Sequence, residues 1–316
     1  MTTNTVHTIF GTGPLGISTA IALTKLGQPV RMVNRSGRAP EGVPAGATVL
    51  AADASSLEAA RSTAAGSAVV YNCANAPYDK WLTDLRPLFN NILEAAVGAK
   101  ARLVLGDNLY AYGETGGAPM REDTPERPNT RKGELRSEIG KAMLTAHRAG
   151  RAPVAIVRGS DYFGPRVRES ALGERVFPAA LAGKAATITG KLDVPHSSTY
   201  ILDMGTAMAM VATRESAYGQ IWHAPNTPAQ TARQMLGTIY AETGKSMKVQ
   251  AAGRLMLSAL GLFNPVIREV VEMQYQFEQP FVVDSGKFER EFAVRATPLA
   301  DAIRATVAWY RTQQAV

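Results

Sequence analysis

The stretch His7-Thr8-Ile9-Phe10-Gly11-Thr12-Gly13-Pro14-Leu15-Gly16 decides the fold of this 316-residue chain. Its first four residues predict a buried strand, and a helical pattern runs from Leu15 to Leu26. Gly11 permits a tight turn, Gly13 lets a pyrophosphate approach the backbone, and Gly16 lets the helix pack close to the strand. This spacing between a strand and a helix predicts a dinucleotide-phosphate site rather than a glycine turn without a ligand. The predicted site comprises Gly11, Thr12, Gly13, Pro14, Leu15 and Gly16.

Short apolar runs alternate with helical patterns along the first 160 residues. Repeated units of this kind form a doubly wound parallel sheet with right-handed crossovers. The fold class is therefore α/β, with a Rossmann-type sheet in a domain of residues 1–165. Further strands are predicted at residues 29–33, 48–50, 68–73, 102–106 and 154–158, and helices at 55–65, 81–98 and 134–149.

After this domain the pattern is less regular, and residues 166–316 predict a smaller, partly helical substrate lobe with segments that return to the Rossmann domain. The apolar segment 255–277 fits a lid, a subunit contact in a homodimer, or the core of this lobe, and the sequence leaves these open. Loops are predicted at 161–165, 195–198 and 225–228, and helices at 177–181, 204–211, 232–242, 254–262 and 298–311.

Composition narrows the range of partners. Apolar residues make up 46% of the chain and charged residues 19%, as in an ordinary globular protein. The formal charge is +7, but the basic residues are scattered, so we expect a small-molecule substrate rather than nucleic acid. No apolar run reaches the roughly 18 residues of a membrane span, and residues 1–7 lack a signal-peptide pattern, so we expect a cytoplasmic protein without a membrane partner. One cysteine and four widely separated histidines predict no metal site.

The turn after the second predicted strand favours NADP(H) as the cofactor. An acidic residue at this point would bind the ribose 2′-hydroxyl of NAD and repel a 2′-phosphate. The sequence instead has Asn34-Arg35-Ser36-Gly37-Arg38. Arg35 and Arg38 can pair with a 2′-phosphate, to which Asn34 and Ser36 can donate hydrogen bonds. The alternative is that both arginines are ordinary solvated residues in a turn.

Two further positions are predicted to contact the cofactor. Asp53 follows the third strand and either accepts a hydrogen bond from the adenine amine or caps the next helix. Cys73 and Ala74 follow the fourth strand, where small residues let the cofactor ribose lie against the backbone. Cys73 is interpreted as a small buried side chain rather than a nucleophile, because no basic residue is near it in sequence.

The order of several short motifs resembles the short-chain dehydrogenase/reductase superfamily, in its extended NAD(P)-dependent epimerase/dehydratase branch. The resemblance covers nearly the whole chain. Besides the glycine loop, it depends on Val70-Tyr71-Asn72-Cys73-Ala74, Leu109-Tyr110-Ala111-Tyr112-Gly113, Arg158-Gly159-Ser160-Asp161-Tyr162-Phe163-Gly164-Pro165, Tyr200-Ile201-Leu202-Asp203 and Trp309-Tyr310.

The catalytic residues implied by this resemblance are not all present. The family's Ser or Thr after the fifth strand is replaced by Asn108. The family's Tyr-x-x-x-Lys pair aligns with Ser137 and Lys141, so a lysine is retained for the nicotinamide ribose while the tyrosine acid is missing. The resemblance therefore implies an atypical member.

Other residues could supply the missing acid or orient the substrate. Tyr162 is placed close to the nicotinamide, although it could simply pack against its loop. His196 could donate a proton near neutral pH, or be incidental. Tyr110 and Tyr112 lie on a loop at a strand end, Asp107 and Asp161 are candidate bases, and Asp161 matches the family's loop asparagine, which implies an orienting role.

Three functions are compatible with these features. The leading one is an NADP(H)-dependent reductase or dehydrogenase that moves hydride to or from a small carbonyl or polarised double bond, with Lys141, Ser137, Asn108, Tyr162 and His196 as candidate catalytic residues. The second is a nucleotide-sugar epimerase or dehydratase that retains its NAD(P) and returns the hydride. The third is a non-catalytic NADP(H)-binding sensor.

Overall fold

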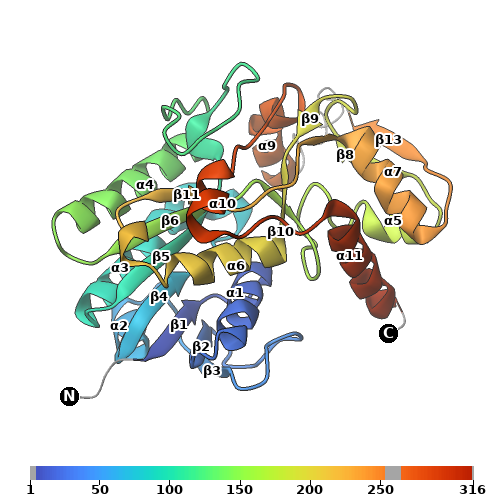
Figure 1. Cartoon of the computed structure of the whole chain (residues 1–316). Helices are drawn as coiled ribbons and strands as arrows, with labels where there is room; N and C mark the ends of the chain where they lie inside the picture. Colours follow the sequence, from blue (N-terminus) through green and yellow to red (C-terminus); the bar gives the residue numbers. More distant parts are fainter. Residues whose placement is uncertain (1–4, 253–264, 315–316) are drawn as a thin grey trace.

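The computed structural model describes residues 5–252 and 265–314, and it is built around one parallel sheet of seven strands (Figure 1). β1 and β4 lie side by side at its centre, so the chain reverses its winding direction between them. This is the topological switch point at which doubly wound sheets bind ligands. In spatial order the strands are β11 (Ile221–His223), β6 (Val154–Arg158), β5 (Arg102–Asp107), β4 (Ser67–Asn72), β1 (Val6–Phe10), β2 (Val30–Asn34) and β3 (Thr48–Ala51).

Helices cover both faces of this sheet, because its central strands alternate apolar side chains between two buried cores. On one face, Ile9 and Tyr71 pack beneath α1 (Pro14–Lys25), α6 (Ile201–Val211) and α10 (Gly286–Phe292). On the other, Phe10, Val70 and Leu103 pack beneath a second set of helices. That set consists of α2 (Leu57–Ala64), α3 (Arg86–Gly98), which continues from the turn η2 (Trp81–Leu85), and α4 (Arg131–Arg148).

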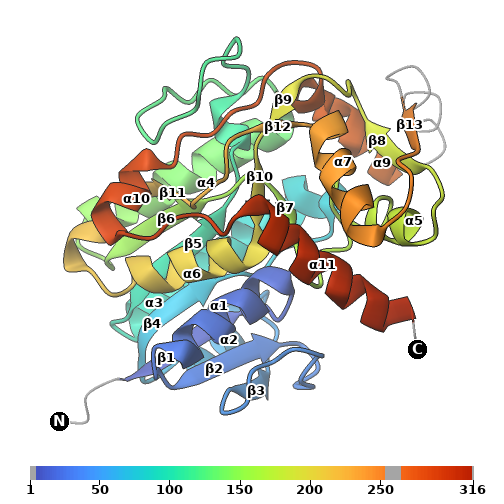
Figure 2. The ribbon, with the colours of Figure 1, turned by 45° about the vertical axis from the view of Figure 1, so that its right-hand side comes forward.

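The C-terminal half forms a smaller lobe with its own apolar core (Figure 2). Phe177, Ile188, Leu236 and Tyr310 are buried in this core. Its elements are β7 (Asp161–Phe163), α5 (Phe177–Leu181), β8 (Ala186–Thr189), β9 (Pro195–His196), β10 (Ser198–Tyr200), β12 (Gln230–Thr231), α7 (Ala232–Thr243), β13 (Val249–Ala252), α9 (Pro265–Glu272), η5 (Gln274–Phe277) and α11 (Leu299–Gln314).

The α/β class, the parallel sheet and all six strands predicted in the first 160 residues are confirmed. Two predicted loops are wrong, because residues 161–165 contain β7 and residues 195–198 contain β9 and the start of β10. The short strand β11 was not predicted, although it extends the sheet beside β6. The predicted helix 254–262 lies entirely outside the described ranges, and the domain boundary at residue 165 stays a prediction.

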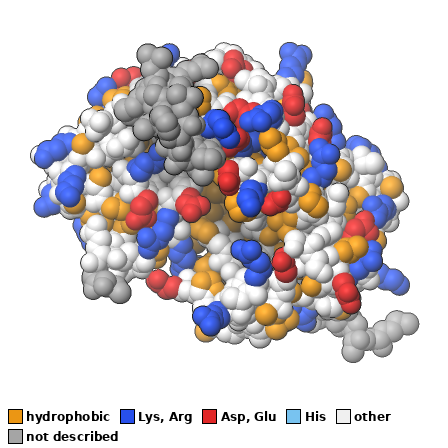
Figure 3. Space-filling view, turned by 180° about the vertical axis from the view of Figure 1, so that it is seen from behind, with side chains coloured by type: hydrophobic (Ala, Val, Ile, Leu, Met, Phe, Trp, Pro, Cys, Tyr) orange, Lys and Arg blue, Asp and Glu red, His pale blue; other side chains and the backbone are white. Residues whose placement is uncertain are grey.

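The surface shows charges of both signs. Figure 3 shows Lys and Arg side chains interspersed with Asp and Glu over one face. Within residues 5–252 and 265–314, no helix has the length and apolar character needed to cross a membrane. The same ranges contain no group of three His, Cys, Asp or Glu side chains arranged to hold a metal ion.

Candidate functional site

The three glycines after β1 differ in the space around them, as their predicted roles require. Gly11 has φ +104°, and a Cβ there would lie 2.6 Å from the carbonyl oxygen of Cys73. A Cβ on Gly16 would lie 2.0 Å from the carbonyl oxygen of Gly11. Gly13 faces open space, with no heavy atom of the described residues within 4 Å of a Cβ. The loop is thus closed toward the protein and open at Gly13, where α1 presents its N-terminal N–H groups.

Asn34 organises the turn at the end of β2. Its Oδ1 accepts hydrogen bonds from the backbone N–H of Ser36 at 3.1 Å and of Gly37 at 2.7 Å. Its Nδ2 donates to Thr12 Oγ1 at 3.0 Å and to the carbonyl oxygen of Arg38 at 2.9 Å. Asn34 therefore joins this turn to the glycine loop, which is a structural role that the sequence did not predict.

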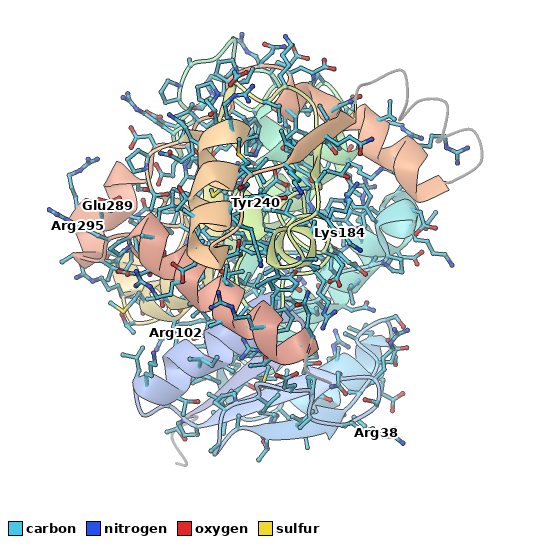
Figure 4. All side chains as sticks on the ribbon, turned by 90° about the vertical axis from the view of Figure 1, so that its right-hand side faces the viewer. Arg38, Arg102, Lys184, Tyr240, Glu289 and Arg295 are labelled. Atoms are coloured by element: carbon cyan, nitrogen blue, oxygen red, sulfur yellow. The ribbon has the colours of Figure 1, made fainter. Side chains whose placement is uncertain are left out.

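The side chains of Arg35, Ser36 and Arg38 are exposed around this turn. Figure 4 shows Arg38 at the outer edge of the Rossmann half, pointing away from the C-terminal lobe. Asp53 accepts a hydrogen bond from the backbone N–H of Ser55 at 2.9 Å, and this bond lowers the pKa of its carboxyl group. Asp53 thus closes a local turn, and the predicted helix-capping role is wrong because Ser56 caps α2 by accepting a hydrogen bond from the N–H of Ala59. The adenine contact of Asp53 stays a prediction.

At the end of β4, Cys73 and Ala74 lie directly against the glycine loop. The N–H of Cys73 donates to the carbonyl oxygen of Phe10 at 2.9 Å. Burial raises the pKa of the Cys73 thiol to about 12, which fits a packing residue and not a nucleophile. The preceding Asn72 is 1% exposed, and its Nδ2 has no hydrogen-bond partner in the described part of the chain. A buried donor without a partner at this edge fits a ligand that carries acceptor oxygens.

The inner face of α4 presents Lys132 and Arg136 to the carboxyl edge of the sheet. Thr130 caps this helix by accepting a hydrogen bond from the N–H of Gly133, so the helix begins earlier than predicted. Lys132 is fully buried, with its Nζ 4.8 Å from the centre of the Tyr78 ring. Arg136, one turn later, is 4% exposed and lies over the Trp81 ring at 4.2 Å.

Each of these buried cations pairs with carboxylates. Lys132 forms ion pairs with Glu269 and Glu272 of α9. Arg136 Nη1 lies 3.3 Å from Asp107 Oδ1 at the end of β5, but its Nε has no partner among the described residues. Like Asn72 Nδ2, this Nε is a buried donor that a bound ligand could satisfy.

Ser137 and Lys141, predicted as the aligned catalytic pair, lie on a different face of α4. Ser137 Oγ donates a hydrogen bond to Glu126 at 2.6 Å, and Lys141 Nζ lies 3.9 Å from the same carboxylate. The Lys141 side chain is 68% exposed. Glu126 also pairs with Arg158 at 2.7 Å, and Arg158 with Asp107 at 3.1 Å. Ser137 is thus held in a structural network, and the ribose contact of Lys141 stays a prediction.

The other predicted residues lie at the strand ends. Asn108 Oδ1 accepts a hydrogen bond from the N–H of Tyr110 at 3.1 Å, so Asn108 shapes the loop after β5. The Tyr162 hydroxyl donates weakly to the carbonyl oxygen of Asp107 at 3.4 Å. Burial raises the pKa of Tyr162 well above its usual range, and burial together with the charge of Asp161 raises the pKa of Tyr110 to about 12. Both phenols are therefore protonated at neutral pH.

His196 and Asp161 lie together on the wall of a small cavity of about 40 Å³ in the C-terminal lobe. His196 Nε2 is 2.7 Å from Asp161 Oδ2. Apolar residues such as Leu172, Ile188 and Met235 form most of the remaining wall. The structure thus brings together His196 and Asp161, for which the sequence predicted independent roles.

Lys132 and Arg136 were not predicted as site residues. The expected helix began at residue 134, so Lys132 fell outside it and the i, i+4 relation with Arg136 was hidden. The signal that could have found them is Thr130, a residue type that favours the N-cap position. A helix started there places Lys132 and Arg136 one turn apart on one face.

Comparison with known proteins shows similarity at the level of the fold. No family model matches the chain. A curated dTDP-glucose 4,6-dehydratase from Streptomyces griseus is 24% identical over 200 residues, which are 63% of this chain and 55% of that protein. The matched region therefore spans only about half of this relative.

Solved structures align over almost the whole chain. Streptomyces venezuelae dTDP-glucose 4,6-dehydratase with NAD and TYD bound has a TM-score of 0.79, with 18% identity and 98% coverage of both chains. Bacillus cereus UDP-glucuronic acid 4-epimerase in complex with NAD has a TM-score of 0.77, with 17% identity and 97% coverage of both chains. The fold is that of the extended short-chain dehydrogenase/reductases, which confirms at the level of the fold the resemblance drawn from the sequence.

Proposed function

We propose that this chain binds a nicotinamide dinucleotide across the ends of β1, β2 and β4 and catalyses hydride transfer at a hydroxyl or carbonyl carbon of a small-molecule substrate. The observation that carries the proposal is the glycine loop. It is packed closed at Gly11 and Gly16, open at Gly13, and located at the switch point of the sheet. This is the arrangement in which a helix N-terminus receives a pyrophosphate.

The chain's own residues fit such a cofactor along its length. The N–H groups of α1 would hold the pyrophosphate, and Arg136 Nε and Asn72 Nδ2 are buried donors left for acceptor atoms at the nicotinamide end. When bound, the cofactor supplies or accepts a hydride at its nicotinamide ring. The protein orients the substrate beside that ring and keeps water away through the buried strand ends.

We propose NADP(H) rather than NAD(H) as the preferred form. Position 34 carries an amide, and its oxygen is occupied by the N–H groups of Ser36 and Gly37. The turn therefore presents no carboxylate to a ribose 2′-hydroxyl, while Arg35 and Arg38 are exposed beside it. Two guanidinium groups at this edge favour a 2′-phosphate.

For the reaction, we favour hydride-returning chemistry on a nucleotide-linked sugar. Its support is the similarity, over nearly the whole chain, to solved structures named as dTDP-glucose dehydratases and UDP-sugar epimerases. A net NADP(H)-dependent reduction of a small carbonyl is the second candidate. The Arg35–Arg38 turn favours this reaction, in which the oxidised cofactor leaves after each turnover and is reduced elsewhere.

One set of assays tests the proposal and separates the two reactions. The purified protein is titrated with NADP⁺ and NAD⁺, and we expect NADP⁺ to bind about tenfold or more tightly, the difference that about 1.4 kcal/mol produces. The Arg35→Ala/Arg38→Ala variant should lose this preference, while Arg61→Ala, an exposed arginine paired with Glu94, should retain it. Failure of both dinucleotides to bind would overturn the proposal.

Turnover is then measured with dTDP-glucose, UDP-glucuronic acid and a panel of small carbonyl compounds. A changed sugar product without net cofactor consumption supports the hydride-returning reaction. Stoichiometric loss of NADPH supports the reductase. Binding of the cofactor with no turnover of any probe would leave the non-catalytic sensor as the better account.

A further inference from the structure

Both ring nitrogens of His196 face oxygens that only accept hydrogen bonds. Nδ1 lies 3.1 Å from the carbonyl oxygen of Gln276, so it must carry a proton to bond there. Nε2 lies 2.7 Å from Asp161 Oδ2, and a second proton is needed between these two atoms. Both contacts are satisfied together only when the pair holds two protons, either both on the ring or one on the ring and one on Asp161.

The other three histidines have no such arrangement. His147 Nδ1 accepts from the backbone N–H of Val154 at 3.2 Å. His223 Nδ1 donates to the carbonyl oxygen of Asp284, which leaves Nε2 to accept from the Tyr112 hydroxyl at 2.8 Å. Burial lowers the pKa of His223 to about 3 and that of His7 to about 4. Both of these rings are neutral at pH 7, so His196 is distinct.

Aromatic side chains hold the His196 ring in place. The imidazole stacks on Phe277, with ring centres 4.9 Å apart, and on Phe281, with ring centres 5.2 Å apart. Stacking on both rings fixes the plane of the imidazole, so its two nitrogens stay directed at Gln276 and Asp161. The side chains of His196 and Asp161 are 13% and 21% exposed, so the pair is largely shielded from solvent.

Asp161 connects the cavity of the C-terminal lobe with the carboxyl edge of the sheet. It begins β7, three residues after the end of β6, and it lines the cavity together with His196. Its charge acts on the Tyr110 hydroxyl, which lies in the loop that follows β5. The proton shared with His196 lies at Oδ2, so Oδ2 is the atom that would pass it to a ligand.

We propose that Asp161 is the proton donor and acceptor for the substrate oxygen, and that His196 is the positioning residue that loads it. This inference rests on the hydride-transfer function proposed above. In reduction, the carbonyl carbon receives a hydride from the bound cofactor, and the carbonyl oxygen takes the proton held by the pair at Asp161. The carbonyl is reduced to an alcohol, the cofactor is oxidised, and the pair is left one proton short. The reverse reaction returns the proton to Asp161.

The assignment supplies an acid where the resemblance expects a tyrosine and the chain has none. The inner face of α4 carries two cations, Lys132 and Arg136, and the helix contains no tyrosine. Tyr162 remains a phenol whose pKa is raised, so it is a poor acid at neutral pH. A carboxyl group that shares a proton with an imidazole transfers that proton more readily than such a phenol does.

Nuclear magnetic resonance of protein labelled with ¹⁵N in its histidine rings tests the proton count directly at pH 7. We expect one ring in the wild type with protons on both nitrogens or with one in a short bond to a carboxyl group, and this signal should be absent from His196→Gln. In Asp161→Asn the ring should carry one proton, because the amide can donate to Nε2. In the control Asp193→Asn, which removes an exposed carboxylate paired with Arg233, the signal should be unchanged.

A wild-type His196 ring with one proton and an unbonded Nε2 would overturn the inference, and the wild-type spectrum decides this even if a variant fails to fold. Cofactor titration on the same samples tests the proposed function separately, and the dyad variants should bind NADP⁺ within about twofold of wild type.

With a probe that the wild type turns over, Asp161→Asn should lower kcat at least about 100-fold with little change in KM. His196→Gln should lower kcat less and shift its pH profile. Unchanged kcat in Asp161→Asn would overturn the donor role. Absence of turnover in every protein, wild type included, would contradict the proposed function, and the donor role with it.

Discussion

The glycine loop and the inner face of α4 border the same edge of the sheet but are built in different ways. In the loop, backbone geometry sets the site, since a Cβ at Gly16 would meet the carbonyl oxygen of Gly11 at 2.0 Å. On α4, buried charges set it, since Arg136 meets Asp107 in a region almost without solvent. The geometry of the glycine loop depends on the space around each glycine, so it can be predicted from the spacing of the glycines in the sequence. The geometry of the inner face of α4 depends on which carboxylates surround each cation.

This difference indicates which positions of the chain can accept other residue types. A glycine loop has one solution, because only glycine fits the contacts and the positive φ at Gly11. A buried network has several solutions, provided each charge keeps a partner. The predictions below alter one region and use the other as reference.

The largest effect is expected for Arg158→Leu. Arg158 is fully buried and pairs with Asp107 and Glu126, so its removal takes one of the two cations from the buried Asp107 carboxylate and leaves it only Arg136. We expect the free energy of unfolding, measured with urea, to fall by about 3–5 kcal/mol. In the control Arg151→Leu, which removes an exposed arginine paired with Glu94, the loss should stay below about 1 kcal/mol. Equal losses would contradict a special role for buried charge.

Acid should destabilise the folded protein through His223, at the end of β11. Burial lowers its pKa from 6.5 to about 3, so between these values the unfolded chain binds a proton that the folded chain does not. Stability from this ring is fully present above pH 6.5 and falls as pH decreases toward 3, by at most about 1.4 kcal/mol per pH unit. Replacing it, in His223→Gln, should flatten the pH dependence of the melting temperature in this window. An unchanged slope would assign the acid sensitivity to other groups.

Substitutions in the glycine loop should affect stability and cofactor binding to different extents. Gly16→Ala forces a backbone collision, and we expect a loss of about 1–3 kcal/mol together with loss of cofactor binding. Gly13→Ala adds a methyl group to open space, so the melting temperature should hold while the affinity for NADP⁺ falls. Gly98→Ala, where the nearest atom lies 3.9 Å away, is the matched control. Normal NADP⁺ binding by Gly13→Ala would argue against a pyrophosphate at this loop.

The smallest effect is expected for Lys141→Ala. Its side chain is 68% exposed and lies at 3.9 Å from its carboxylate partner, so stability should change by less than about 0.5 kcal/mol. Cofactor affinity should also hold, whereas Arg136→Met should weaken it through loss of the buried Nε donor. A tenfold weaker NADP⁺ affinity in Lys141→Ala would support the ribose contact predicted from the sequence.

The sequence predicted the parallel sheet because strand and helix periodicity is local, and it predicted the loop because each glycine there has a steric reason. It did not predict the buried cations of α4, since Lys132 and Arg136 face the strand ends, while the catalytic role of Ser137 and Lys141 on a different face stays a prediction. A shift of five residues along a helix changes which face is inward, and only packing resolves it. The His196–Asp161 contact joins residues 35 apart, so no local pattern could reveal it.

The central claim is that the strand ends between the glycine loop and Asp161 form one cofactor and substrate site. A crystal structure of the protein with NADP⁺ tests it most directly. The account predicts the pyrophosphate at the N-terminus of α1, the 2′-phosphate beside Arg35 and Arg38, and the nicotinamide within reach of Arg136. A dinucleotide bound away from the glycine loop, or a nicotinamide turned away from the ends of β4, β5 and β6, would contradict it.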